Sequence, residues 1–175
     1  MKKSLWGLVA ILAFSPALAY AACITSIPET SPLARFIDNG DGTVTDARTA
    51  LMWTRCSLGQ TWNGTTCVGT ASKHTWQAAL QQADTFAYAG HTDWRLPNVK
   101  ELVSIVERRC SNPSINETIF PATPTFWFWT SSPSAQGPGT HAHNVSFSDG
   151  TDLVDYKQHS NTFFYHHVRL VRAAR

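Results

Sequence analysis

Long hydrophobic runs are almost absent from this sequence of 175 residues. The one that occurs, Leu5–Phe14, is shorter than the roughly 20 apolar residues that a membrane-spanning helix needs. Two lysines precede it and small residues follow at Ala17, Ala19 and Ala21, which is the three-part pattern of a secretory signal peptide. We therefore expect residues 1–21 to be a signal peptide cleaved after Ala19 or Ala21, and the mature chain not to insert into a membrane.

A lipid anchor is a weaker alternative for the same segment. Cys23 follows the small residues, but Tyr20 stands where a lipoprotein signal has an aliphatic residue. We therefore predict simple export, to the periplasm or to the outside of the cell surface.

An excess of basic residues is also lacking. The whole chain has 14 Lys and Arg against 12 Asp and Glu, and Lys2 and Lys3 leave with the signal peptide. The mature chain is then formally neutral, which argues against a nucleic-acid partner. All seven histidines lie in the mature part, so its charge should become positive below about pH 6.

Signatures of enzyme chemistry are missing too. The chain has no G-x-S-x-G motif for a nucleophilic serine, and its cysteines are expected to be oxidised. Asp149, Asp152 and Asp155 lie close in sequence, which leaves a carbohydrate-active enzyme with paired carboxylates as a minor alternative. We expect no catalytic activity and no catalytic residues.

Four cysteines remain after export, an even number that predicts two disulfides in an oxidising compartment. Cys56 and Cys67 bracket a polar loop and are the natural first pair, which leaves Cys23 and Cys110 for the second. A zinc site is the alternative, but no C-x-x-C spacing or Cys/His cluster supports it.

The stretch "FIDNGDGTVTD" is rich in Asp and Gly and suggests either a calcium loop or a turn. Placing Gly42 at position 6 of a calcium-binding loop puts Ile37 at position 1 and Arg48 at position 12, where oxygen ligands are required. The alternative register, with Gly40 at position 6, fails at Arg35 in the same way. Asn-Gly and Asp-Gly are strong turn pairs, so we interpret Asp41 and Gly42 as structural residues of a turn between strands.

Two helices are expected in the middle of the chain, between short strands on either side. Residues 72–90 carry one apolar face, with Ser72 or Thr75 as a cap and Gly90 as the stop. In the second helix, Asn98 and Glu101 form a pair typical of a capping box, and Arg108 and Arg109 are expected in its last turn. Short strands, two helices and further strands predict an α+β fold with antiparallel sheets.

Six segments occur here in an order that resembles the Lcl C-terminal domain family, named after a bacterial collagen-like adhesin: "NGDGTVTDARTALMWTRC", "TWQAAL", "AGHTDWRLPNVKELVSIV", "INETIFP", "FWTSSP" and "VRLVR". The resemblance runs from Phe36 to Arg172. "WRLP" before a helix and "VRLVR" near the end also look like the formylglycine-generating-enzyme branch of C-type-lectin-like folds. We accordingly divide the chain into a signal peptide (1–21), an extended lead-in (22–35) and one domain (36–175).

The resemblance implies a C-type-lectin-like fold with two helices on short antiparallel sheets and a long loop-rich C-terminal region. It also implies export and binding at a surface, with sulfated polysaccharides as the ligand class. Within its motifs we interpret Trp94 as a core residue between the helices, Pro97 as the start of the second helix, and Arg95 as a hydrogen-bonding partner of Asp93 or Glu101.

The segment 131–161 is rich in Ser, Gly, His, Asp and Asn, a composition typical of recognition loops. The candidate ligand-binding residues there are His141, His143, Asp149, Asp152, Lys157 and His159. His141 and His143 have the i, i+2 spacing that places both on one side of a strand, so a divalent cation is a weak alternative to no cofactor.

We therefore predict a secreted, non-catalytic binding or adhesion module whose partner is an extracellular polysaccharide or a surface protein. A structural role in pilus or surface assembly is the main alternative, and the oligomeric state is left open. Histidines crowd the C-terminal third, including His166 and His167. If several share a face, protonation near pH 6 would create a basic patch and strengthen binding to a polyanion.

Overall fold

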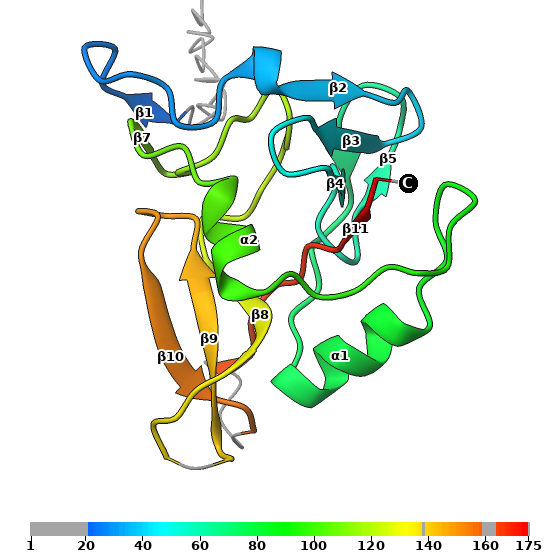
Figure 1. Cartoon of the computed structure of the whole chain (residues 1–175), viewed down its shortest axis with the longest axis vertical. Coiled ribbons are helices and arrows are strands. Elements are labelled where there is room, and N and C mark those ends of the chain that lie inside the picture. The colour runs from blue at the N-terminus through cyan, green and yellow to red at the C-terminus, as the bar shows by residue number, and fades with distance from the viewer. Residues whose placement is uncertain (1–20, 138, 159–163, 175) are drawn as a thin grey trace, which may run out of the picture.

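The computed structural model describes residues 21–137, 139–158 and 164–174, and its elements form an α+β fold with small antiparallel sheets. A four-stranded sheet occupies the upper part of Figure 1 and a three-stranded sheet the lower left, with one helix between them and the other at the lower right. Two further sheets have two strands each. The α+β class and the antiparallel sheets predicted from the sequence are confirmed.

The four-stranded sheet contains both ends of the segment that resembles the family, Phe36 and Arg172. Its strands are β2 (Phe36–Asp38), β3 (Thr43–Asp46), β4 (Leu51–Thr54) and β11 (Val171–Ala173), in the order β11-β4-β3-β2. Trp53 in β4 pairs with Val44 on one side and Val171 on the other, and all three are buried. The C-terminal strand is therefore part of the core.

The Asp- and Gly-rich stretch forms the expected turn between β2 and β3. Oδ1 of Asp41 accepts hydrogen bonds from the backbone N of Thr43 (2.9 Å) and from its hydroxyl (2.6 Å). Gly42 has a φ of +86°, and a Cβ there would lie 2.1 Å from the hydroxyl of Tyr88 and 2.8 Å from Cγ of Trp62. Asp41 thus closes the turn, and Gly42 allows the loop to approach two aromatic side chains.

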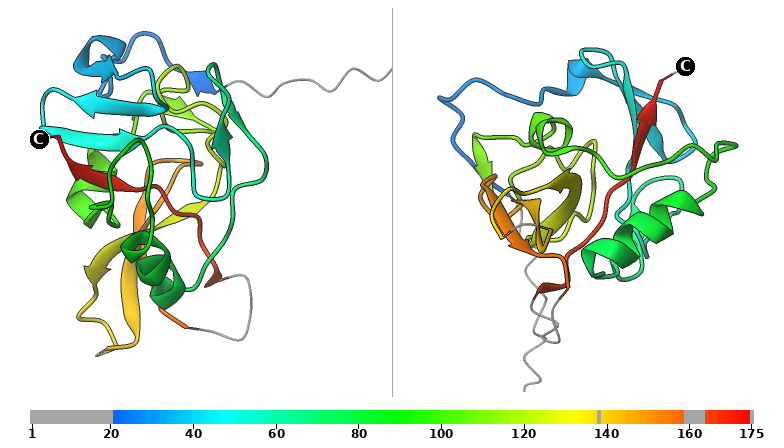
Figure 2. Two further views of the ribbon diagram at one scale, coloured as in Figure 1. Left: turned by 90° about the vertical axis from the view of Figure 1, so that its right-hand side faces the viewer. Right: turned by 60° about the horizontal axis from the view of Figure 1, so that its bottom comes forward.

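The three-stranded sheet consists of β8 (Trp127–Pro133), β9 (His141–Ser146) and β10 (Asp152–Tyr156), with β9 in the centre. The views in Figure 2 show it as a layer separate from the four-stranded sheet. Its two faces contribute to two clusters of buried residues. Phe128 and Val145 belong to the cluster that contains Trp53, whereas Trp129 and Ala142 belong to the second.

Each helix is shorter than the sequence predicts. α1 (Trp76–Asp84) is capped by Thr75 as expected, but it ends six residues before Gly90. The intervening backbone turns back on itself instead, with hydrogen bonds exchanged between Tyr88 and His91. The capping box of Asn98 and Glu101 is confirmed in α2 (Val99–Ser104).

Arg108 and Arg109 lie beyond the end of α2, which corrects their placement in its last turn. The guanidinium of Arg109 instead pairs with Glu29 of the lead-in. The two arginines therefore cannot stabilise the C-terminus of α2 through its dipole.

The segment before α2 has a structural role, although the buried cluster that contains Trp94 includes residues of α1 and none of α2. Trp94 is buried in the second cluster, and its Nε1 donates to the carbonyl of Tyr88 at 3.1 Å. Arg95 donates to both carboxylate oxygens of Glu101 at 2.8 Å, and its backbone exchanges two hydrogen bonds with Val171. Pro97 is buried just ahead of α2, and its carbonyl accepts from Ser131.

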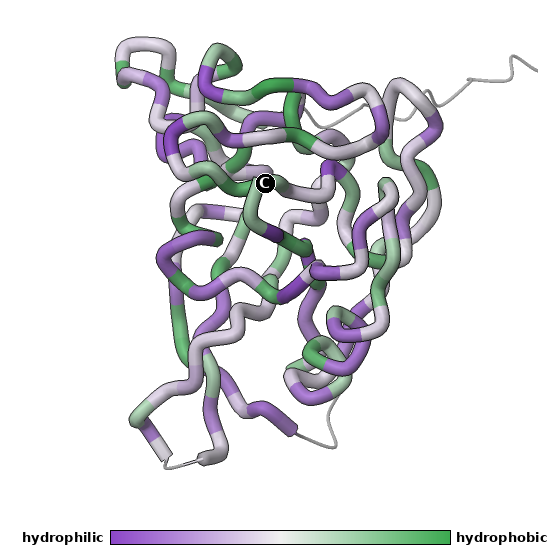
Figure 3. Tube along the Cα trace, turned by 45° about the vertical axis from the view of Figure 1, so that its right-hand side comes forward, coloured by the Kyte–Doolittle hydropathy of each residue, from purple (hydrophilic) through white to green (hydrophobic). Residues whose placement is uncertain are grey.

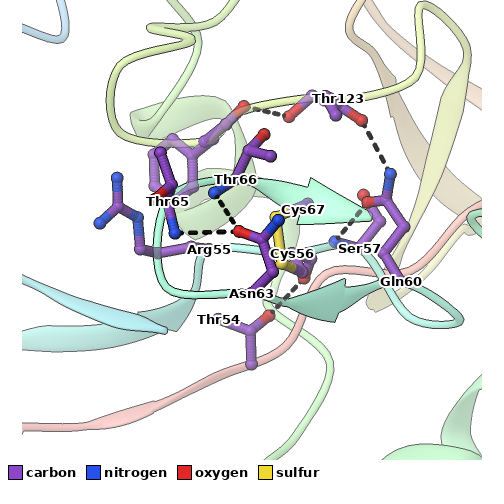
Figure 4. Close-up of a disulfide and its surroundings, with 12 residues drawn as sticks. Thr54, Arg55, Cys56, Ser57, Gln60, Asn63, Thr65, Thr66, Cys67 and Thr123 are labelled. Atoms are coloured by element: carbon purple, nitrogen blue, oxygen red, sulfur yellow. Dashed lines mark hydrogen bonds between the residues drawn. A yellow bond between two sulfur atoms is a disulfide. The ribbon is translucent and has the colours of Figure 1, made fainter. Parts of the chain in front are cut away.

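Both predicted disulfides are present. Cys23–Cys110 joins strands β1 (Ala22–Cys23) and β7 (Cys110–Ser111), so the lead-in is attached to the domain. Cys56–Cys67 closes the loop shown in Figure 4, whose strands are β5 (Thr61–Trp62) and β6 (Cys67–Val68). Inside that loop Asn63 accepts hydrogen bonds from the backbone of Thr65 and Thr66.

Arg169 is fully buried, in the "VRLVR" segment. Its guanidinium donates to the carbonyls of Thr54 and Arg55 and to the hydroxyl of Thr123, and it lies 4.7 Å from the ring centre of Phe120. Complete burial lowers the pKa of Arg169 to about 9. Its role is to join the β4 segment and the Phe120 loop to the C-terminal strand.

In the described part of the chain, hydrophobic residues occur in short stretches between hydrophilic ones (Figure 3). In the part that the structure describes, no helix is long and apolar enough to cross a membrane.

Candidate functional site

Two of the residues predicted for ligand binding, His141 and Lys157, lie at one end of the β9–β10 hairpin, with their side chains on opposite sides of it. His141 begins β9 and is paired in the ladder with Tyr156, the last residue of β10, and their ring centres are 4.2 Å apart. The next residue, Lys157, donates its backbone N–H to the carbonyl of Thr140 at 2.8 Å. Because side chains alternate along a strand, Tyr156 and Lys157 point to opposite sides of the hairpin.

An open hollow of about 570 Å³ lies on the Lys157 side of this hairpin end. We call it the hairpin-end hollow; it is lined by Trp76, Gln77, Gly139, Thr140, Lys157 and Gln158. The start of α1 forms one side, and the residues just before β9 and just after β10 form the other. The sequence interpretation missed the contribution of α1, because the apolar spacing of Trp76 indicates only a core position.

The indole of Trp76 is fixed by the neighbouring strands. Its Nε1 donates to the carbonyl of Thr130 in β8 at 2.7 Å, and its backbone N donates to the carbonyl of Lys157 at 3.0 Å. The ammonium of Lys157 lies 4.4 Å from the centre of the Trp76 ring. A cation over an aromatic face is stabilised by about 0.5–1 kcal/mol at an exposed site, so this pair gives the hollow a defined shape.

Amide groups complete the polar surface of the hollow. Nε2 of Gln158 donates to Oε1 of Gln77 at 3.0 Å, which leaves the second N–H of Gln158 and the amide N–H groups of Gln77 facing solvent. The hollow thus combines an indole, one ammonium and paired amides. Such a surface suits a ligand with many hydroxyl groups and apolar C–H faces, because amides both donate and accept while an aromatic ring covers C–H groups.

A cluster of buried histidines is connected to β10 through Asp155. Nε2 of His166 is 3.2 Å from Oδ2 of Asp155 and 3.3 Å from Nδ2 of Asn144. His167 is buried beside it and contacts the carbonyl of Ser72 through Nδ1 at 3.0 Å. Burial lowers the pKa of His166, although Asp155 opposes this, and burial lowers the pKa of His167 to about 4.

The burial of these two histidines corrects the prediction that they contribute to a basic surface patch. Neither His166 nor His167 is available at the surface, and Arg169 nearby is buried as well. The C-terminal third therefore presents fewer cations than its sequence suggests.

The comparison with known families covers both the hollow and the core around it. The family model described as the Lcl C-terminal domain matches residues 42–172. The chain belongs to the Lcl C-terminal domain family. Neither the search of curated proteins nor that of solved structures gave a match.

The remaining predicted residues of this Lcl C-terminal domain lie away from the hollow. Asp152 pairs with Val145, four ladder positions from the His141–Tyr156 pair, which places it about 13 Å along the hairpin. Asp149 lies in the turn at that far end. Burial raises the pKa of Asp149, but hydrogen bonds from Thr151 and Ser146 outweigh it and lower the pKa overall. Asp149 and Asp152 are thus separated from Lys157, and His159 lies outside the described residues.

His143 and His141 share one side of β9, as the sequence predicted. His143 is half-buried, and Nδ1 of His141 contacts the hydroxyl of Thr140 at 2.7 Å. Among the described residues of the Lcl C-terminal domain, no group of three or more His, Cys, Asp or Glu side chains is placed to hold a metal ion.

Proposed function

We propose that this Lcl C-terminal domain is an exported, non-catalytic binding module that recognises an extracellular polysaccharide at the hairpin-end hollow. The observation that carries the proposal is the arrangement of Trp76, Lys157 and the Gln77–Gln158 pair around one open surface. The family supports a surface- or adhesin-associated domain. Two disulfides suit the oxidising conditions outside the cytoplasm, in the periplasm or beyond it.

A C-type-lectin-like fold is part of this proposal. Two short helices, small antiparallel sheets and a loop-rich C-terminal half are compatible with it. In that arrangement the loops beside the C-terminal hairpin would carry the binding surface, as the location of the hollow suggests.

No divalent cation is required by the proposed recognition. Its polar groups are amides, a hydroxyl and an ammonium, which bind hydroxyl-rich ligands directly. The weak metal candidates His141 and His143 lie on the other side of the hairpin from Lys157. Binding should therefore persist in the presence of EDTA.

A role in surface or pilus assembly is the second candidate, favoured by the edge strand β10. Leu153 in this strand is 54% exposed, and β10 is the outer strand of its sheet. An exposed edge strand with an apolar side chain is a template for pairing with another chain. Light scattering of the mature protein decides this point, since assembly predicts oligomers that a Leu153→Lys variant abolishes.

The polysaccharide proposal is tested on a glycan array that contains neutral, carboxylated and sulfated polymers, read with and without EDTA. The Lys157→Met variant should weaken the best array hit about tenfold, the effect of losing a charged hydrogen-bond donor. Lys100→Met, which removes an exposed lysine on α2, is the matched control and should bind like the wild type. Absence of binding to every polymer on the array would reject the function.

A further inference from the structure

A second open hollow, of about 460 Å³, lies at the other end of α1. We call it the helix-end hollow; its lining includes Leu80, Gln81, Asp84, Trp94, Arg95 and Ser131. Its exposed groups include an amide and a carboxylate, and the largely buried Trp94 also belongs to its lining.

The two hollows lie on the same face of α1. Trp76 and Gln77 line the first, and Leu80 and Gln81 follow each of them by four residues to line the second. Residues four apart on a helix lie above one another, so the face is continuous from one hollow to the other. From Trp76 to Asp84 it extends over about 12 Å, at 1.5 Å per residue.

The hollows also share the neighbouring strand. The carbonyl of Thr130 in β8 accepts the hydrogen bond from the Trp76 indole, and the next residue, Ser131, lines the helix-end hollow. β8 therefore runs beside both hollows, and it is in contact with α1.

Cations are scarce along this surface. Arg95 is held by both oxygens of Glu101, and Asp84 adds an exposed carboxylate. Lys157 lies over an indole. Elsewhere in the described part of the chain four further arginines are paired with carboxylates, namely Arg35, Arg55, Arg109 and Arg172. A densely sulfated chain needs a row of free cations, and the described residues that line the two hollows do not form one.

We propose that the two hollows are parts of one cleft that binds an internal segment of a linear polysaccharide of low charge density. This inference rests on the proposed function and adds the shape and charge of the ligand. Both hollows are open to solvent, so a chain can continue past either end of α1. Gln77 and Gln81, one in each hollow, bind successive sugars of the same chain.

Two probes test this inference: cello- and chito-oligosaccharides from disaccharide to octasaccharide, measured by titration calorimetry, with heparin oligosaccharides of equal length as the charged counterpart. The affinity for the better neutral series should rise at least tenfold from the disaccharide to the hexasaccharide and then level off. Gln77→Ala and Gln81→Ala should each weaken hexasaccharide binding about fivefold, the effect of one lost hydrogen bond.

The matched control is Gln82→Ala. Gln82 is exposed and adjacent to Gln81, but it points away from both hollows. It should bind the hexasaccharide like the wild type.

Each other outcome overturns a different statement. Equal affinity for short and long neutral chains, or an effect of Gln77→Ala without one of Gln81→Ala, rejects the continuous cleft but leaves the function at the hairpin-end hollow in place. Tighter binding of heparin than of the neutral series, lost with salt, rejects the low charge density. Failure of the neutral and the heparin oligosaccharides to bind rejects the inference, and the glycan array then tests the proposed function separately.

Discussion

Nε2 of His166 lies 3.2 Å from Oδ2 of Asp155, which connects β10 to the buried segment that leads into β11. The contact lies among three histidines, since His74 and His167 are close enough to affect each other's charge, and Lys73 adds a positive charge to the same cluster. Burial lowers the pKa of His74 as it does those of the other two. Lowering the pH therefore affects histidines in the interior of this domain.

The free energy of unfolding should fall as the pH is lowered from about 6.5 to about 4. In this window the unfolded chain binds protons at histidine, whereas folded His167, with a pKa of about 4, does not. Its contribution corresponds to a loss of about 3 kcal/mol at the acid end. Urea unfolding at both pH values measures this, and His167→Gln should reduce the difference. His141→Gln, at a half-buried histidine outside this cluster, is the control, and an equal pH effect in both variants would contradict the assignment.

Two glycines in the β2–β3 turn should respond differently to alanine. Both have a positive φ, +80° at Gly40 and +86° at Gly42, so each substitution costs about 1 kcal/mol of backbone strain. At Gly40 the new methyl group meets nothing within 4 Å, but at Gly42 it meets Tyr88 and Trp62. Thermal or urea unfolding should show that Gly42→Ala destabilises the domain by about 1–3 kcal/mol more than Gly40→Ala does. This difference is the usual cost of forcing an extra methyl group into a packed site. Equal losses would show that the loop moves away freely.

Arg169→Met should destabilise the domain by about 3 kcal/mol or more. The substitution removes donors from the carbonyls of Thr54 and Arg55 and from Thr123, and these acceptors stay buried without water. Arg169→Lys should recover only part of the loss, because one ammonium cannot reach all three acceptors. Arg48→Met, at an exposed arginine, is the control in the same unfolding assay. A stable Arg169→Met variant would show that packing alone holds this region.

The two disulfides should contribute unequally to stability. In the chain-entropy model, Cys56–Cys67, with a sequence separation of 11, contributes about 3 kcal/mol, and Cys23–Cys110, with a separation of 87, about 4.5 kcal/mol. Paired Cys→Ser variants compared by urea unfolding test the order. A larger loss of stability on removing Cys56–Cys67 would mean that the disulfides stabilise the domain mainly through contacts in the folded state and not by restricting the unfolded chain.

Local signals in the sequence predicted local structure well. The capping box of Asn98 and Glu101 and the turn at Asp41-Gly42 depend on residues a few positions apart, and both are present. The disulfide pairing followed from the number of cysteines and the loop between two of them. The ends of the helices were less predictable, because the Tyr88–His91 turn and the Trp94–Tyr88 hydrogen bond replace the last turns expected for α1.

The candidate site could not be assembled from the sequence in the same way. Gln77 and Gln158 meet across 81 positions, and nothing in either segment indicates the other. The polar segment 131–161 includes Lys157, but the pairing register separates Asp149 and Asp152 from it. The burial of both His166 and His167 was also missed, since alternation along a strand predicts one buried side chain of the two.

The Cys23–Cys110 bond also determines how this domain would respond to a pull on its two ends. Tension applied at the lead-in passes through the sulfur atoms directly to Cys110, so the chain between the two cysteines carries none of it along the covalent path. β2, β3, β4 and both helices lie within this bypassed segment. A stretched molecule can lengthen only on the C-terminal side of Cys110, and there β11 must first separate from both β4 and Arg95.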